Sequence, residues 1–286
     1  MHCGDDPDVP HRQPAVIGAE LLRRLVPMPD AIQASRRAFV AAHAGEVTGP
    51  LRSSLSRHRV LVMPVEHVSG SALVKVISLH EDGWAQGLPS IEGTVLWIDG
   101  PTGRVTAQVD AAALTSLRTG AASGLATGLL ADPASRVLAM LGAGGQAPDQ
   151  VAGVCAVRPI REVRVYSRRA QRREELCERL RAGHPGVRFV ASDSPARAVG
   201  DADVICTATR SAIPLFQPAD VQKTVHINAI GAYRLDMREV PSGLLGQAGV
   251  VVVDQLDAAL AEAATTWSRS ARSCPDRRRA ANSSTG

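Results

Sequence analysis

A glycine-rich turn after an apolar segment is the feature that most constrains how this chain can fold. Val137–Leu141 has the length and composition of a buried strand, and the sequence G-A-G-G-Q-A follows it at residues 142–147. In a dinucleotide-binding turn the first glycine allows a tight bend, the second lets the backbone approach a pyrophosphate, and the small last residue lets helix and strand pack closely. The helix that begins there offers free N–H groups to phosphate oxygens. A second strand-like segment, Glu162–Tyr166, follows after one helix length, and this context favours a cofactor-binding turn over an ordinary loop.

Strand-like and helical segments alternate through the second half of the chain. An Ala-rich helix is predicted over residues 114–130, and Asp132 and Pro133 follow it. Short apolar strands with helical intervals between them come next, at residues 137–141, 162–166, 203–207, 225–230 and 250–253. Such alternation favours a parallel, doubly wound sheet with helices on both faces. We therefore predict a Rossmann-type α/β domain over residues 114–254.

The first part of the chain has a different pattern, which predicts a mixed α+β domain over residues 14–113. Apolar residues recur at helical spacing over residues 15–47, and Pro27 and Pro29 divide them into two helices. Strand signals follow, and a Gly-Pro-Thr-Gly turn at residues 100–103 predicts a hairpin. The predicted strands are 60–63, 72–77, 93–99 and 105–109.

The two ends of the chain lack any such pattern. Residues 1–13 are polar and without periodicity, and we expect them to be disordered. Residues 255–264 resemble the start of an amphipathic helix, whereas residues 265–286 form an Arg/Ser-rich tail with no apolar stripe. Five arginines, one aspartate and no lysine lie from Ala264 to Gly286, so this end accounts for the whole formal net charge of +4. The rest of the chain therefore has no excess of positive charge with which to bind nucleic acid.

Composition excludes several other classes of protein. Aromatic residues make up only 3% of the chain, which argues against a stacking surface for single-stranded nucleic acid. No apolar stretch approaches the roughly 20 residues that span a membrane, and the polar N-terminus is unlike a signal peptide. The five cysteines are scattered without a C-x-x-C pair, and the eight histidines show no metal-ligand spacing. We expect a cytoplasmic enzyme with reduced thiols and no metal.

Several short motifs, taken in order, resemble one family. Leu114–Ala122 reads L-T-S-L-R-T-G-A-A and is combined with the glycine turn at residues 142–147, which is a specific pairing. The pattern continues in Arg52, Val62–Pro64, Val74–Val76, Gly87–Ser90, Leu96–Gly103, Val165–Arg168 and His226–Ala232. Over residues 15–263 the chain is similar to the ornithine cyclodeaminase/mu-crystallin family. The resemblance implies a Rossmann domain that binds a nicotinamide cofactor, and a second domain for substrate binding and dimerisation.

The resemblance also implies an activity. Members of this family move a hydride to or from the α-carbon of an amino or imino acid. Their reactions include ketimine reduction, pyrroline-2-carboxylate reduction and ornithine cyclodeamination. We therefore expect an NAD(P)-dependent oxidoreductase of the ketimine or pyrroline-2-carboxylate reductase type, which acts as a homodimer on a small imino or amino acid.

At matching positions the resemblance assigns Lys75 to catalysis and Arg52, Met63 and Arg118 to substrate binding. A lysine buried within the apolar stretch Val74–Ile77 would have a lowered pKa and could donate or accept a proton. The guanidinium group of arginine forms a planar fork that fits a carboxylate. From the residues alone, a solvent-facing lysine and surface salt bridges by the arginines are open alternatives.

A larger set of residues is expected to bind the cofactor, mostly at the ends of strands where Rossmann ligands lie. These residues are Ser90, Thr119, Gly142, Ala143, Gly144, Gly145, Gln146, Ala147, Ser167, Arg168, Thr207, Ala208, Thr209, Asn228, Ile230 and Gly231. After the second strand an NAD enzyme usually carries an acid that binds the ribose hydroxyls, whereas this chain has Ser167 and Arg168. A hydroxyl and a guanidinium suit a 2′-phosphate, so we expect NADP(H) to be favoured over NAD(H). The alternative is that the arginines only begin a solvated basic helix.

Two departures from the family pattern leave the activity open. Ornithine cyclodeaminases carry an acid just after the strand at residues 225–230, where this chain has Tyr233. A tyrosine can relay a proton but cannot pair with an ammonium group, so ornithine cyclodeaminase is the second interpretation. Glu239 matches a family position outside the site. The sequence after Ala264 lacks the family's last helix, as if the reading frame had changed, and the third alternative is a truncated, inactive cofactor-binding chain.

Overall fold

A computed structural model describes residues 13–50, 52–55, 60–80, 89–256 and 259 of the chain. The chain divides into two compact units, and the division falls between Arg118 and Thr119. We call the part before this point unit 1 and the part after it unit 2; each has a β-sheet of its own. The disorder predicted for the N-terminus, and nearly all of the predicted helix start and tail at residues 255–286, lie outside the described residues.

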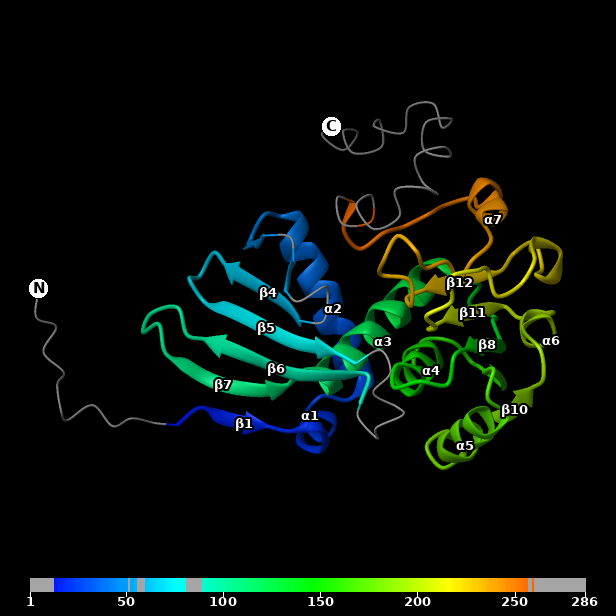
Figure 1. Cartoon of the computed structure of the whole chain (residues 1–286), viewed down its shortest axis with the longest axis horizontal. Helices are drawn as coiled ribbons and strands as arrows, with labels where there is room; N and C mark the ends of the chain where they lie inside the picture. The colour runs from blue at the N-terminus through cyan, green and yellow to red at the C-terminus, as the bar shows by residue number, and fades with distance from the viewer. Residues whose placement is uncertain (1–12, 51, 56–59, 81–88, 257–258, 260–286) are drawn as a thin grey trace, which may run out of the picture. The chain divides into compact units, whose positions relative to one another are not determined.

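Unit 1 is built on a seven-stranded sheet, and Figure 1 shows strands β4 to β7 lying side by side. The strand order is β1-β7-β6-β5-β4-β2, and β3 also pairs with β4. Every pair is antiparallel except β1 with β7. The elements are β1 (Ala15–Ile17), α1 (Ala19–Leu25), α2 (Met28–His43), β2 (Val47–Thr48), β3 (Ser53–Leu55), β4 (Val60–His67), β5 (Ala72–Leu79), β6 (Ile91–Ile98) and β7 (Val105–Asp110).

The structure confirms the main predictions for unit 1. β6 and β7 form the predicted hairpin, and Pro27 separates two helices as expected. The start of the helical stretch differs, because Ala15–Ile17 is a strand that pairs with β7. Gly18, in an extended conformation, lies between this strand and the first helix.

Strand β4 is longer than predicted, because it continues through Pro64 to His67. Pro64 lies between the residues that pair with β3 and those that pair with β2. The N–H of Val68, the residue directly after β4, donates to the carbonyl of Glu46 at 2.8 Å, on the side of β4 where β2 and β3 pair. Alternate amides of a strand point the same way, so the backbone nitrogens of the even-numbered residues of β4 face this side. The missing N–H of Pro64 therefore points into a gap between two partner strands and costs no strand hydrogen bond.

One face of the unit 1 sheet carries its core. Leu61 and Ile77 are direct neighbours on β4 and β5, and both are buried together with Val95 on β6 and with Ala111. Side chains alternate between the two faces of a strand, so Lys75, two residues before Ile77, lies on this same face.

Helix α3 (Ala111–Leu130) follows β7 directly and crosses the division between the units. It begins three residues before the predicted start because the carboxylate of Asp110 accepts a hydrogen bond from the N–H of Ala113 at 2.7 Å and so caps the helix. Farther along, a Cβ atom on Gly120 would lie only 2.2 Å from the carbonyl oxygen of Asp149 on the next helix. This close approach explains a glycine within a helix, where it otherwise costs stability.

Unit 2 has a five-stranded, fully parallel sheet in the order β10-β9-β8-β11-β12. The chain runs from β8 outward through β9 and β10, then crosses to β11 and β12 on the other side. This arrangement confirms the predicted doubly wound α/β fold. The elements are β8 (Val137–Leu141), α4 (Ala147–Cys155), β9 (Glu162–Tyr166), α5 (Ala170–Arg181), β10 (Arg188–Ser192), α6 (Pro195–Val199), β11 (Val204–Thr207), a 3-10 turn (Pro218–Asp220), β12 (His226–Ala229) and α7 (Ser242–Gln247).

The strands of unit 2 differ from the prediction at two places, where one strand was missed and one predicted strand is absent from the described residues. Arg188–Ser192 forms the outer strand β10, which the sequence did not reveal because Phe189 is its only large buried side chain. The apolar stretch at residues 250–253 is irregular instead of a strand, and Val250, Val251 and Val252 are all exposed. Apolar content alone therefore did not predict which of these two segments pairs as a strand.

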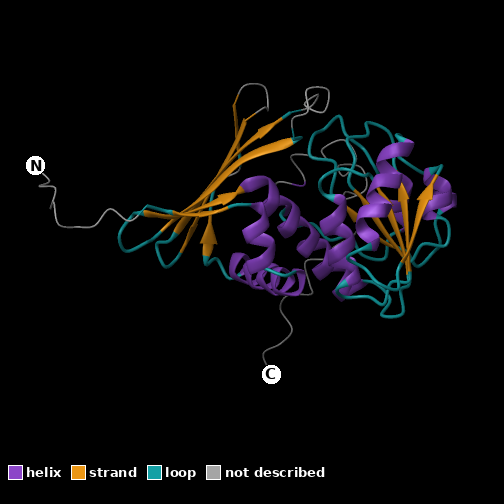
Figure 2. Ribbon diagram, turned by 90° about the horizontal axis from the view of Figure 1, so that it is seen from below, coloured by secondary structure: helices purple, strands orange, loops and turns teal. Residues whose placement is uncertain are grey.

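Both faces of the unit 2 sheet are covered, as expected for a doubly wound sheet (Figure 2). Met140 and Val165 belong to a cluster with residues of α4 and α5. Ala139 and Leu141, which point the other way, pack with Phe216 and with residues of α6. The strands are therefore apolar on both sides, which explains their near-continuous apolar sequences.

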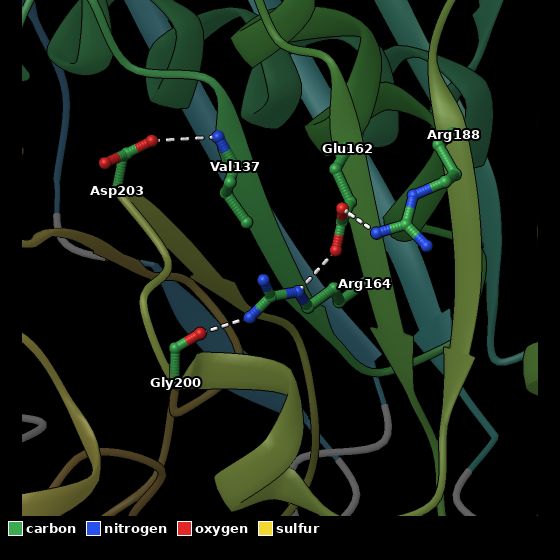
Figure 3. A network of polar contacts seen from close by, with 6 residues as sticks. All are labelled: Val137, Glu162, Arg164, Arg188, Gly200 and Asp203. Atoms are coloured by element: carbon green, nitrogen blue, oxygen red, sulfur yellow. Dashed lines mark hydrogen bonds and ion pairs between the residues drawn. The ribbon is translucent and has the colours of Figure 1, made fainter.

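Ion pairs and hydrogen bonds tie the strands together at the amino edge of this sheet (Figure 3). Glu162 accepts hydrogen bonds from Arg164, at 2.6 Å, and from Arg188 of β10. Asp203, just before β11, accepts from the backbone amides of Arg136 and Val137 at 2.7 and 2.9 Å. Burial opposes ionisation of both carboxyls, but these hydrogen bonds outweigh it and lower the pKa values of Glu162 and Asp203.

Candidate functional site

Strand pairing aligns the carboxyl ends of four unit 2 strands at one edge. The N–H of Gly142 donates to the carbonyl of Tyr166 at 2.8 Å, which joins the ends of β8 and β9. The N–H of Ala208 donates to Leu141 at 2.8 Å, and that of Ile230 donates to Thr207 at 3.0 Å. The predicted cofactor-binding segments after β8, β9, β11 and β12 therefore meet at this edge, on the side opposite the ion pairs of Figure 3.

The glycine turn has the geometry that its sequence predicts. Gly142 has a φ of +116°, and a Cβ atom there would lie 2.4 Å from the carbonyl oxygen of Ala208. A Cβ atom on Gly144 would meet no atom within 4 Å, so the backbone at this residue is open to a ligand. Ala147 is fully buried in the core between sheet and helices. The three small residues thus fit the bend, the approach of a pyrophosphate and the close packing of helix α4.

A depression of about 280 Å³ lies beside this turn. Ala143, Gly144 and Gly145 line one side, and Arg172 and Arg179 of α5 are among the residues on the other. Arg172 is not among the residues predicted from the sequence to bind the cofactor. A larger depression of about 690 Å³ lies along α5 and contains none of the predicted site residues, so the smaller one is the relevant feature.

The turn between β9 and α5 carries the residues expected to select the cofactor. Ser167 is half-buried and Arg168 is exposed. The guanidinium of Arg173 donates to the carbonyl oxygen of Ser167 at 3.0 Å and so holds the turn by its backbone. Within the described part of the chain, Arg168 and Arg172 form no ion pair with an acidic side chain.

Asn228 is at the predicted edge, but its side chain is occupied within unit 2. Its amide nitrogen donates to Thr127 at 2.9 Å, and its amide oxygen lies 3.1 Å from Nε2 of His226. Asn228 is 6% exposed. Its role toward a cofactor remains a prediction, and one that the side-chain hydrogen bonds do not support.

Glu239, which matches a family position outside the site, contacts residues that are predicted to bind the cofactor. Its buried carboxylate forms hydrogen bonds with Thr207, Thr209 and Gly231, all three of which are predicted cofactor-binding residues. Nothing in the sequence around Glu239 signals this, because the contact depends on the fold of the loops that follow β11 and β12.

Unit 1 contains the predicted catalytic lysine. Lys75 lies on β5 between Met63 of β4 and Val95 of β6. Burial, and secondly the positive charge of Arg118, lower the pKa of Lys75 from 10.5 to about 8. Lys75 can therefore exchange a proton near neutral pH, and the solvent-facing alternative is not supported.

The other predicted residues of units 1 and 2 are placed as follows. Arg52 is exposed directly before β3, Arg118 is exposed on α3, and Met63 is half-buried beside Lys75. Ser90 is exposed before β6, and its carbonyl accepts a hydrogen bond from the N–H of His80 at 3.0 Å. Thr119 is buried on α3. Their roles toward ligands remain predictions.

The described residues offer neither a metal site nor a membrane span. No group of three or more His, Cys, Asp or Glu side chains among them could hold a metal ion. In the same part of the chain, every helix is too short or too polar to cross a membrane.

Comparison with known proteins identifies the family. A profile of the ornithine cyclodeaminase/mu-crystallin family matches residues 14–267 of the chain. The chain belongs to this family. The family predicted from its motifs is thereby confirmed, and the match includes both units.

Relatives and a solved structure agree with this assignment. The chain is 34% identical over 254 residues to a Delta(1)-pyrroline-2-carboxylate reductase of Bacillus cereus, covering 86% of the chain and 77% of the relative. It is also 34% identical over 260 residues to the ketimine reductase mu-crystallin of Mus musculus, covering 88% and 81%. The structure of Thermococcus litoralis Delta(1)-pyrroline-2-carboxylate reductase in complex with NADH and L-proline is similar with a TM-score of 0.81 and 30% identity, covering 87% of the chain and 78% of that protein.

Proposed function

We propose that the chain uses NADPH to reduce a small cyclic or linear imino acid to the amino acid. The observation that carries the proposal is the dinucleotide-binding edge of unit 2, where the glycine turn and the ends of four strands meet. The names of its relatives, a pyrroline-2-carboxylate reductase and a ketimine reductase, support the same class of NAD(P)-dependent oxidoreductase acting at an α-carbon.

The residues of unit 1 supply the remaining chemistry. When bound, the nicotinamide supplies a hydride for the imine carbon. Arg118 and Arg52 pair with the substrate carboxylate and so orient that carbon. Lys75, with its pKa of about 8, holds a proton near neutral pH and places it beside the imino group. Met63 provides apolar surface next to Lys75.

The preference for NADPH rests on charge at the end of β9. No acid follows that strand in the sequence to bind the ribose hydroxyls, while the guanidinium groups of Arg168 and Arg172 offer two cations for a 2′-phosphate. Arg172 and Arg179 line the same depression as Gly144 and Gly145, with Glu175 as its one acid, so the net positive charge there favours a phosphate. This extends the earlier expectation, which rested on Ser167 and Arg168.

Ornithine cyclodeaminase is the less favoured activity. Tyr233 stands where an acid would handle the substrate amine, and its ring contacts the guanidinium of Arg234, 5.7 Å from the ring centroid. A neutral tyrosine carries no negative charge with which to pair with the substrate ammonium group. The residue at position 233 therefore favours imine reduction.

One assay separates these activities. NADPH oxidation is followed by its absorbance with pyrroline-2-carboxylate, its six-membered analogue and linear imino acids. The same preparation is then incubated with ornithine and NAD⁺, and proline and ammonia are measured. Reduction of at least one imino acid without proline formation supports the proposal. Proline and ammonia from ornithine would support cyclodeamination, and cofactor binding without turnover would support the inactive alternative.

We also propose that the chain is a homodimer through the sheet face of unit 1 opposite its core. Val62, Val74, Val76 and Leu96 project from that face, and Val16 at its edge is 72% exposed. Contiguous apolar surface of this kind marks association sites. Val74→Arg should convert a dimer to a monomer in light scattering, with Val68→Arg, a change in an exposed loop, as the control. A parent protein that is monomeric at micromolar concentration overturns this part of the proposal.

A further inference from the structure

Glu239 joins two turns at the carboxyl edge of the unit 2 sheet. Its side chain is 2% exposed and lies between the turn after β11 and the turn after β12. Oε1 accepts hydrogen bonds from the backbone N–H and the hydroxyl of Thr209, at 2.5 and 2.7 Å. Oε2 accepts from the hydroxyl of Thr207 at 3.0 Å and from the N–H of Gly231 at 2.7 Å. Each oxygen thus receives two donors, which is the full capacity of an ionised carboxylate.

The backbone that carries Glu239 is also fixed. The N–H of Arg238 donates to the carbonyl of Ser211 at 2.7 Å, and the N–H of Leu215 donates to the carbonyl of Glu239 at 2.9 Å. Glu239 is therefore anchored on both sides to the loop that follows β11. Because its peptide cannot shift freely, its carboxylate sets the distance between the two turns.

The turn after β12 approaches so closely that it requires glycine. A Cβ atom on Gly231 would lie 2.3 Å from the carbonyl oxygen of Thr209 and 2.6 Å from Oε1 of Glu239. Atoms at those distances would have to move apart. The two turns are therefore in direct contact, and the carboxylate of Glu239 accepts hydrogen bonds from both of them.

We propose that Glu239 is a positioning residue that holds these two turns where they contact the nicotinamide end of the cofactor. The inference rests on the proposed function, because it takes the carboxyl edge as the cofactor site. The location of Glu239 at the carboxyl edge distinguishes it from a residue that only stabilises the fold. Glu162 also accepts two hydrogen bonds and ties strands of the same sheet together, but at the opposite edge (Figure 3).

The test compares Glu239→Gln with Glu162→Gln in the full chain. The amide of the substituted side chain replaces an acceptor by an NH2 donor, which would face the N–H of Thr209 or of Gly231. We expect the dissociation constant for NADPH to rise about tenfold or more, because a hydrogen bond to a charged group is lost and a donor is left without an acceptor. We also expect kcat at saturating NADPH to fall, while the KM for the imino acid changes little. Glu162→Gln should lower the melting temperature but leave NADPH binding unchanged.

Hydrogen exchange tests the contact itself without cofactor. In Glu239→Gln the backbone amides of Thr209 and Gly231 should exchange faster than in the parent, and amides at the amino edge should not change. Parent values for exchange, NADPH affinity and kcat in this variant would overturn the inference. If the parent binds no NADPH, but Thr209 and Gly231 still exchange faster in Glu239→Gln than in the parent, the proposed function is refuted and the contact is established.

A second variant covers the case in which Glu239→Gln does not fold. Glu239→Asp keeps the charge but is one methylene shorter, so the carboxylate cannot reach both turns. Weaker NADPH binding in a folded Glu239→Asp protein supports the inference, and unchanged binding overturns it.

Discussion

Lys75 lies directly opposite Met63 where β4 and β5 pair, on the face of the sheet that carries the core of unit 1. This position places an amine among apolar side chains, and the nearby charge of Arg118 adds repulsion. Both effects disfavour the charged amine, so Lys75 reduces the stability of the fold while providing a group that can exchange protons near neutral pH.

The first prediction follows from the lowered pKa of Lys75. In the unfolded chain the amine has its ordinary pKa of 10.5, against about 8 in the folded protein. Between these two pKa values the unfolded chain binds more protons than the folded protein, so the free energy of unfolding rises with pH. Below about pH 8 the amine is charged in both states, and the full cost of burying that charge remains. Lys75→Met should abolish turnover and raise the free energy of unfolding at pH 7 by about 1–2 kcal/mol, allowing for partial exposure. Urea denaturation measures this gain, which should shrink progressively as the pH rises above about 8 and vanish above the ordinary lysine pKa of 10.5. A variant less stable than the parent at neutral pH would contradict the argument.

The second prediction concerns cofactor preference. Arg168→Asp should weaken NADPH binding by about tenfold or more, since it removes a cation and adds an anion beside the 2′-phosphate, and it should leave NADH binding similar or improved. Arg172→Ala should weaken both cofactors if it acts on the pyrophosphate, and NADPH alone if it acts on the 2′-phosphate. Fluorescence titration of the parent and of each variant with both cofactors measures the dissociation constants, with Arg161→Ala at the amino edge as the control. Equal affinity of the parent for NADPH and NADH would refute the preference.

The third prediction contrasts two glycines of one turn. Gly142→Ala should lower stability by about 2 kcal/mol or more, because φ is +116° and the added Cβ would lie 2.4 Å from the carbonyl of Ala208. Gly144→Ala should leave the melting temperature nearly unchanged, since a Cβ there meets nothing within 4 Å, but it should block the approach of the pyrophosphate. Thermal unfolding and NADPH titration of both variants decide this. Full NADPH affinity in Gly144→Ala would show that the cofactor does not approach there.

The fourth prediction concerns acid stability. The pKa values of Glu162 and Asp203 are lowered in the folded protein, so their contribution is present above the ordinary carboxyl values and is lost as the pH falls through the folded values. Glu162→Gln should cost about 1–2 kcal/mol at pH 7 and progressively less below about pH 4.5. Denaturation at several pH values measures the slope. A difference between parent and variant that stays constant down to about pH 3 would rule out this linkage.

Much of unit 2 could be predicted from the sequence because its signals are local. The bend at Gly142, the open backbone at Gly144 and the packing of Ala147 each follow from the small size of one residue in a turn after a strand. Strand β10 escaped prediction because only Phe189 marks it as buried. The apolar stretch at residues 250–253 misled for the opposite reason, since apolar side chains there are exposed.

The features of the candidate site that escaped prediction depend on distant contacts. Glu239 reaches Thr207 over 32 positions of the chain, and no local pattern encodes that pairing. Arg172 was not among the predicted cofactor-binding residues, and only the depression that it lines together with Gly144 and Gly145 distinguishes it. For Asn228 the position near the strand end was predicted correctly, but the direction of its side chain was not, because its amide donates to Thr127 within unit 2.

The anchoring of the β9–α5 turn by Arg173 has a consequence for engineering. Arg173 holds the carbonyl oxygen of Ser167, so the path of the main chain does not depend on which side chains occupy positions 167 and 168. We therefore expect that both residues can be substituted together, for example by Asp and Ile, while the backbone of the turn keeps its conformation. If these two positions select the cofactor as proposed, the same scaffold can be switched between the phosphorylated and the unphosphorylated nicotinamide pool of a cell without changes in unit 1.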